Sequence, residues 1–113
     1  MKEADWTEDF PGSIMICDLQ GIVVAMNEKA AQMYRKDGGR ALMGKSLFDC
    51  HPEPALSKFR QLLESGEINI YTTEKKGIKK LLYQAPWIQD GQRRGMIELA
   101  LEIPLHMPHF LRD

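Results

Sequence analysis

The feature that most limits the possible folds is a pair of short β-rich runs, residues 13–18 and 22–26, joined by a tight turn. The turn reads Asp-Leu-Gln-Gly, and Gly21 can adopt the positive φ that a tight hairpin requires. Asn27 follows the second run at once and is a preferred N-cap residue, which predicts a helix over 28–36. A hairpin that leads directly into a helix favours a mixed α+β domain.

The rest of the chain fits the same class. Glycine and proline interrupt residues 40–54, where we expect short helical turns, and apolar residues recur at helical spacing from 55 to 64. Three β-rich runs follow, at 67–74, 78–88 and 94–103. Strands that are consecutive in the chain can pair as hairpins while the helical block crosses one face, so we predict an antiparallel α+β layer.

Size and charge exclude several classes of protein. A chain of 113 residues has room for one domain, and its net charge of −1 gives no long-range field that would attract nucleic acid. No apolar run approaches the roughly 20 residues of a membrane-spanning helix, and the acidic start does not resemble a signal peptide. We therefore expect a cytoplasmic protein with no membrane or nucleic-acid partner, and we expect Cys17 and Cys50 to be reduced thiols.

Three motifs, in this order and spacing, resemble the PAS sensory family. They are Asp18-x-x-Gly21 leading into Ile22-Val23-Val24-Ala25-Met26-Asn27, then Gly44-Lys45-Ser46-Leu47-Phe48, and finally Asp90-Gly91-x-x-x-Gly95-Met96-Ile97-Glu98-Leu99. The segments Asp49-Cys50-His51-Pro52 and Gly95-Met96-Ile97-Glu98 are most similar to PAS modules of bacterial proteins that also carry hemerythrin-like domains.

The resemblance covers residues 12–103 and implies an α+β fold. Its sheet is five-stranded and antiparallel, in the order 2-1-5-4-3 when strands are numbered along the chain, with helices forming a cup over one face. Residues 1–11 are then an N-terminal arm and residues 104–113 a C-terminal tail. The implied function is that of a sensory module without enzymatic activity.

The strand at 94–103 separates two sets of side chains by simple alternation. By resemblance to the register of the family, Met96, Glu98 and Ala100 point into the cup. The residues implied to line a ligand pocket there are Met15, Cys17, Tyr34, Leu47, His51, Phe59, Leu82, Gln84, Met96 and Glu98.

Glu98 is the most unusual member of this set, because a carboxylate inside a cup is costly unless it meets a hydrogen-bond donor. One interpretation pairs Glu98 with a protein group such as His51, Tyr34 or a backbone N–H. The other leaves Glu98 to bind a polar ligand. The first is the commoner arrangement in proteins.

The opposite face of the same strand carries an aliphatic row, Ile97, Leu99, Leu101 and Ile103. Burying each large aliphatic side chain is worth about 1.5–3 kcal/mol, so this row needs a cover. We expect a homodimer joined through this face, with Trp6 and Phe10 of the arm contributing to the interface. Coverage by the arm alone is the alternative.

The sequence identifies no cofactor. The blue-light flavin subgroup of the family carries its adduct-forming cysteine where this chain has Leu47, and Cys50 is displaced by three positions, so flavin photochemistry is not expected. Haem-binding relatives use a histidine near His51, but no second axial ligand or apolar slot is evident. A helix-capping role for His51 is the preferred interpretation.

Other candidate chemistry is weak. His106 and His109 are interrupted by Pro108 and lack a third metal ligand, and adjacent Cys50 and His51 side chains rarely converge on one reacting atom. The lysines of 75–80 are interpreted as a solubilising surface at a hairpin tip. We therefore expect neither a metal site nor an enzyme.

The leading hypothesis is a cytoplasmic PAS-type module that binds a small ligand or protein partner and signals through homodimer contacts. The alternative is a ligand-free dimerisation or interaction module. Pro104 replaces the usual junction to an output helix. The chain is therefore expected to act either as a separate subunit with an output partner or as the N-terminal part of a longer regulator.

Overall fold

The computed structural model describes residues 6–49 and 51–113. Its strands are β1 (Ser13–Asp18), β2 (Val23–Met26), β3 (Asn69–Lys75), β4 (Ile78–Gln89) and β5 (Gln92–Ile103). Its α-helices are α1 (Glu28–Met33) and α2 (Ala55–Ser65). Three short 3₁₀ turns lie between them: η1 (Arg35–Asp37), η2 (Gly39–Leu42) and η3 (Leu47–Asp49).

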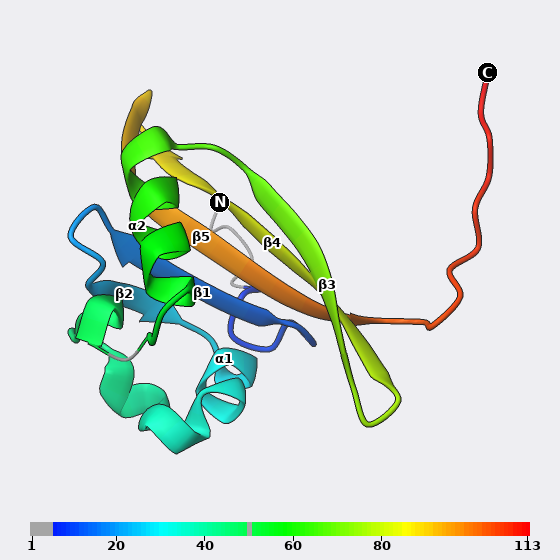
Figure 1. Ribbon diagram of the computed structural model, residues 1–113, viewed down its shortest axis with the longest axis horizontal. Coiled ribbons are helices and arrows are strands. Elements are labelled where there is room, and N and C mark those ends of the chain that lie inside the picture. Colours follow the sequence, from blue (N-terminus) through cyan, green and yellow to red (C-terminus); the bar gives the residue numbers. More distant parts are fainter. Residues whose placement is uncertain (1–5, 50) are drawn as a thin grey trace.

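The five strands form one antiparallel sheet in the order β2-β1-β5-β4-β3, as predicted. The chain crosses from β2 at one edge to β3 at the other through the helical block. In Figure 1, α1 and α2 lie on the same face of the sheet, and residues 104–113 run away from it beyond β5. The predicted α+β architecture, with helices covering one face, is confirmed.

The β1–β2 turn follows the local chemistry of its sequence. One carboxylate oxygen of Asp18 accepts hydrogen bonds from the backbone N–H groups of Gln20 and Ile22, both at 2.9 Å. Gly21 has φ +80°, in the left-handed region that glycine adopts at no steric cost. The turn is therefore closed by an aspartate side chain and a glycine, two residues that turns favour for these reasons.

Asn27 joins three parts of the molecule and is almost completely buried. Its Oδ1 accepts hydrogen bonds from the backbone N–H groups of Ala30, which caps α1, and of Ile14 in β1, both at 3.0 Å. Its Nδ2 donates to the backbone oxygens of Thr7 (2.8 Å) and Gly12 (2.9 Å) in the N-terminal arm. The predicted N-cap is confirmed, and the same side chain also holds the arm.

The first helix is shorter than predicted. The α-helix ends at Met33, and the expected remainder up to residue 36 continues instead as the 3₁₀ turn η1. Gly38, the C-cap of η1, has φ +113°, in the left-handed region that glycine adopts without steric cost. The backbone N–H groups of Asp37 and Gly38 donate to the oxygens of Tyr34 and Arg35, three residues back, which is the 3₁₀ pattern.

The core lies between the sheet and the helices. Phe59, Leu62 and Leu63 form the buried face of α2 and pack with residues of β1, β2 and β5. Gly66 ends α2 with φ +71°, in the usual C-terminal left-handed conformation. Within the part of the chain that the structure describes, no helix has the length and apolar character needed to cross a bilayer.

The edge of the sheet at β2 is covered by its own chain. The backbone N–H of Gly44 donates to the oxygen of Val23 (2.8 Å), and the Val23 N–H donates to the oxygen of Lys45 (3.0 Å). The Leu47 N–H then donates to the oxygen of Gly21 (2.8 Å). These bonds fix the start of η3 and hold Leu47, which is buried, against the sheet.

Candidate ligand-binding cavity

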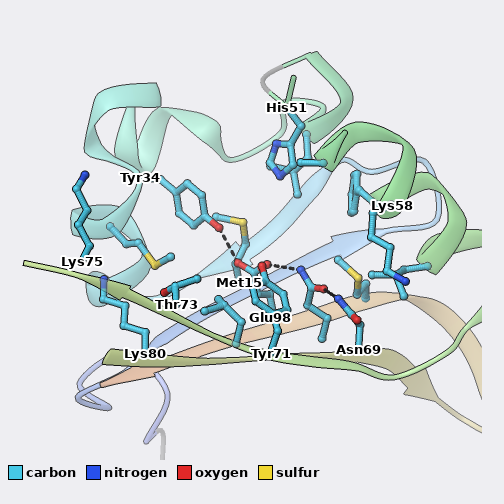
Figure 2. A pocket seen from close by; sticks show the side chains of 18 of the residues that line it. Met15, Tyr34, His51, Lys58, Asn69, Tyr71, Thr73, Lys75, Lys80 and Glu98 are labelled. Atoms are coloured by element: carbon cyan, nitrogen blue, oxygen red, sulfur yellow. Dashed lines mark hydrogen bonds between the residues drawn. The ribbon is translucent and has the colours of Figure 1, made fainter. Parts of the chain in front are cut away.

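A cavity of about 1000 Å³ lies between the inner face of the sheet and the helices. Figure 2 shows His51 and Tyr34 pointing into it from the helical side, and Tyr71, Thr73 and Glu98 pointing into it from the sheet. The volume is at the upper end of the range for small-molecule sites in proteins.

All ten residues predicted to line the pocket are on the wall of this cavity. The apolar ones are buried: Met15, Cys17, Leu47, Phe59, Leu82 and Met96. The polar ones are half-buried: Tyr34, His51, Gln84 and Glu98. The apolar lining is therefore deeper than the polar one, and whether a ligand binds here stays a prediction.

A chain of hydrogen bonds crosses the cavity floor, drawn as dashed lines in Figure 2. The Tyr34 hydroxyl donates to one Glu98 oxygen (2.6 Å), and the Gln84 Nε2 donates to the other (2.7 Å). The Asn69 Nδ2 donates in turn to the Gln84 Oε1 (2.8 Å). Of the two interpretations of Glu98, pairing with protein groups is the one seen in the structure, and Tyr34 is one of the partners.

The strand register explains why these polar groups meet. Asn69 of β3 lies opposite Gln84 of β4, Gln84 lies opposite Glu98 of β5, and Glu98 lies opposite Met15 of β1. The four residues form one row across the sheet, and directly opposed side chains on one face are close enough to bond. Tyr34 completes the network from the turn that follows α1.

Two titratable groups on the wall are affected by this environment. Burial raises the pKa of the Cys17 thiol to about 11, with the carboxylates of Asp18 and Glu98 also disfavouring the thiolate. Burial also raises the pKa of Tyr71, and the charge of Glu98 adds to that effect. Both groups are therefore protonated at neutral pH, so Cys17 is a neutral, weakly reactive thiol.

The prediction missed the contribution of β3 and its hairpin. Asn69, Tyr71, Thr73 and Lys75 alternate along β3 and line the cavity, together with Lys80 of β4. The alternation was visible in the sequence, but the face of an edge strand depends on its pairing register, which the sequence did not supply. The other lining residues that were not predicted are Met33, Ala55, Lys58, Leu62, Glu74, Lys76, Ile78 and Glu102.

His51 lines the cavity and packs against the ring of Phe59, with ring centroids 5.6 Å apart. The N-cap position of α2 is occupied by Pro54, so His51 is not the N-cap residue of this helix. Haem ligation by His51 stays untested. Cys50 lies outside the described residues. The predictions that involve its thiol are therefore not tested by the structure.

Residues 6–49 and 51–113 contain no cluster of three or more histidine, cysteine, aspartate or glutamate side chains suited to a metal ion. His106 and His109 both lie in the exposed tail, residues 104–113.

The outer face of the sheet carries the predicted aliphatic row. Ile97, Leu99, Leu101 and Ile103 are half-buried, and Leu99 lies between Ile14 of β1 and Tyr83 of β4 in the register. A contiguous apolar surface thus spans several strands.

The N-terminal arm reaches this face at one point. Gly12 lies against the side chains of both Phe10 and Leu101, so the arm covers the end of the row near Leu101. Trp6 packs edge-on against Phe10, with ring centroids 5.6 Å apart, but is still 60% exposed. The arm covers part of the row, and a homodimer interface here stays a prediction.

Comparison with known proteins identifies the family. Residues 7–103 match the family model described as the PAS fold. No curated protein matches the chain significantly. Among solved structures, the chain is similar to VqmA of Vibrio cholerae as a dimer without target DNA, with 18% identity and a TM-score of 0.60. The alignment covers 94% of this chain and 54% of the VqmA chain, so this chain spans about half the length of that protein.

Two further structures share the fold. A C-terminal domain from Streptococcus mutans is 21% identical, with a TM-score of 0.69 over 85% of this chain and 78% of the other. The Aer2 receptor of Vibrio cholerae, described as a dual PAS-haem oxygen sensor, is 18% identical, with a TM-score of 0.58 over 81% of this chain and 94% of the other. The family model covers most of the chain, which therefore belongs to the PAS family of generally sensory, non-enzymatic domains, as the sequence resemblance predicted.

Proposed function

We propose that this PAS domain binds a small ligand in the cavity and signals its occupancy through homodimer contacts on the outer sheet face. The observation that carries the proposal is the row of half-buried polar side chains, Asn69, Gln84 and Glu98, on the floor of a cavity whose buried wall residues are apolar. A few convergent polar groups in a large apolar pocket are typical of small-molecule sites.

The sheet itself supplies the connection between the two faces. Glu98 faces the cavity, while Ile97 and Leu99, its neighbours in β5, face outward. A ligand that changes the hydrogen bonds of Glu98 acts on the strand that carries the proposed interface. We propose no enzymatic activity and no nucleic-acid contact for this domain, whose net charge is −1.

In this proposal residues 12–103 are the sensor, residues 1–11 are an arm at the interface and residues 104–113 lead toward an output domain or partner. We place the protein in the cytoplasm. VqmA, to which the fold is similar, is described as a dimer and as bound to the ligand DPO, which supports both halves of the proposal by analogy.

A second candidate function is a dimerisation module with no ligand. It is favoured by the fact that both oxygens of Glu98 already accept hydrogen bonds from protein groups, Tyr34 and Gln84. Such a carboxylate is stable in an empty cavity. This alternative predicts no small-molecule adduct in native mass spectra.

The experiment that tests the leading proposal is a thermal-shift screen of a metabolite library, followed by the Glu98→Gln variant. A ligand that raises the Tm of the wild type should lose most of that effect in Glu98→Gln. Glu64→Gln, which changes an exposed glutamate of α2 outside the cavity wall, is the matched control and should respond like the wild type. A library without any stabilising compound would favour the ligand-free module.

Dimerisation is tested separately by sedimentation velocity over a range of concentrations. A monomer at high micromolar concentration would reject the homodimer. A dimer that dissociates when Leu99 is replaced by Arg would support the outer-face interface.

A further inference from the structure

The exposed rim of the cavity is basic at the end formed by the β3–β4 hairpin. Lys75 and Lys76 at the tip of this hairpin line the cavity, and so does Lys80 of β4. Figure 2 shows Lys75 and Lys80 at the same end of the cavity, beyond Tyr34, whereas Lys58 of α2 lies on the other side. A hairpin tip that only aids solubility has no need to direct ammonium groups toward a cavity.

The strand register brings two of these ammonium groups close together. Lys80 lies opposite Thr73, and Lys75 follows Thr73 by two residues, so Lys75 and Lys80 are diagonal neighbours on one face. In the described part of the chain neither lysine forms an ion pair, since the ion pairs found there are those of Arg40. Two like charges at this spacing repel each other, and an anion placed between them would relieve that repulsion.

Acidic residues at this end do not balance the lysines. Glu102 of β5 lies opposite Lys80, and Glu74 of β3 also lines this end of the cavity. The three lysines at this end, Lys75, Lys76 and Lys80, therefore outnumber the two glutamates. The local potential favours a negatively charged group.

The deep end of the cavity has the opposite preference. Glu98 presents a carboxylate to the cavity floor, and its charge disfavours any anion placed beside it. The wall around it is apolar and buried, formed by Met15, Leu47, Phe59, Leu62, Leu82 and Met96. An anionic group is therefore tolerated only at the rim, and an apolar body fits the interior.

We propose that the ligand of this cavity is an amphiphilic organic acid, with its carboxylate held between Lys75 and Lys80 and its apolar body directed inward. This inference rests on the proposed ligand-binding function and specifies the class of ligand. A cavity of about 1000 Å³ has room for such a molecule. A cationic amphiphile would be disfavoured, because its positive charge would lie beside the lysines of the rim.

The test uses decanoate as the anionic probe and decanol as its uncharged counterpart. Isothermal titration calorimetry of the full chain at low salt should show decanoate binding roughly tenfold more tightly than decanol. The difference should shrink as salt is added, because Lys75 is exposed to solvent and Lys80 is only half-buried.

Charge variants of opposite sign make the test specific. The double variant Lys75→Gln/Lys80→Gln should reduce the preference for decanoate to about one, whereas Glu102→Gln should tighten decanoate binding by a few fold. Lys45→Gln, an exposed lysine outside the cavity wall, is the matched control and should leave the preference unchanged. Binding of decanol should be the same in all four proteins.

Two negative results are distinguishable. Equal binding of decanoate and decanol, unaffected by the rim variants, overturns the ligand class while the cavity stays a ligand site. Binding of neither probe overturns the ligand class too, and if native mass spectra then show no small-molecule adduct, the proposed function itself fails.

Discussion

The two faces of the sheet differ at the centre of β4 and β5, where each departs from the pattern usual in a half-covered sheet. On the inner face, covered by helices, β4 and β5 present Gln84 and Glu98, while on the outer face the same strands present Tyr83 and Leu99. Covered faces are ordinarily apolar and uncovered faces polar. The inner face keeps that rule at Leu82 and Met96 and breaks it at Gln84 and Glu98, whereas the outer face breaks it along its aliphatic row. These two departures are the basis for proposing a small ligand at the inner face and a second protein surface at the outer face.

Introducing the same charge on each face should have the largest and most unequal effects. Leu82→Lys places an ammonium group on the inner face at a site only 4% exposed, and we expect it to destabilise the fold by about 5 kcal/mol. Leu99→Lys on the outer face should cost about 1 kcal/mol because that side chain can reach solvent. Urea denaturation monitored by circular dichroism measures both.

The same pair of variants separates folding from association. Leu99→Lys should keep its fold and lose the dimer in sedimentation velocity. Equal destabilisation by the two variants would show that the outer face is as closed as the inner one.

The two faces are joined at Asn27, which caps α1 on the inner side and holds the arm that reaches Leu101 on the outer side. Asn27→Ala removes partners from buried backbone groups and should lower the free energy of unfolding by about 3 kcal/mol. Chemical denaturation provides the measurement. Asn69→Ala, which removes one half-buried hydrogen bond at the cavity floor, is the matched comparison and should cost about 1 kcal/mol.

Cys17 on the inner face should also make the free energy of unfolding depend on pH in the alkaline range. Burial raises the pKa of this thiol from 9.0 to about 11, so the folded state binds its proton more tightly than the unfolded state. The resulting stabilisation is fully present below pH 9 and is lost as the pH rises through about 11. The difference in unfolding free energy between wild type and Cys17→Ala should therefore shrink by about 2 kcal/mol over this range. A constant difference would mean that the thiol is not desolvated.

The smallest expected changes in the free energy of unfolding are those of two tyrosine variants, one on each face of the sheet. Tyr34→Phe removes the donor to Glu98 and should lower the free energy of unfolding by about 1.5 kcal/mol, since hydrogen bonds to charged groups are worth more than neutral ones. Tyr83→Phe on the outer face should change it by less than about 0.5 kcal/mol. Thermal denaturation of the two variants gives the comparison, and an equal effect would show that the Glu98 network does not stabilise the folded state.

Much of the fold could be predicted because its signals are local. Gly21, Asn27 and the spacing of apolar residues in α2 specify a turn, a cap and a helix face through contacts within a few residues. The end of α1 was placed too late because the last turn is 3₁₀ rather than α, a difference in hydrogen bonding that the apolar spacing does not show.

The cavity was predicted in part, and the missing part is instructive. The residues of β1, β4 and β5 followed from the register implied by the family, whereas Asn69 and Lys75 depend on how β3 pairs with β4. A one-residue change of that pairing would turn both side chains to the other face. The sequence alone therefore did not reveal the basic rim.

The central claim is that the inner face holds a small molecule and the outer face a second copy of the chain. Native mass spectrometry of the freshly purified protein tests both at once. The account predicts a species of twice 13.0 kDa that carries additional small-molecule mass in each protomer. A bare 13.0 kDa species at every concentration would contradict it.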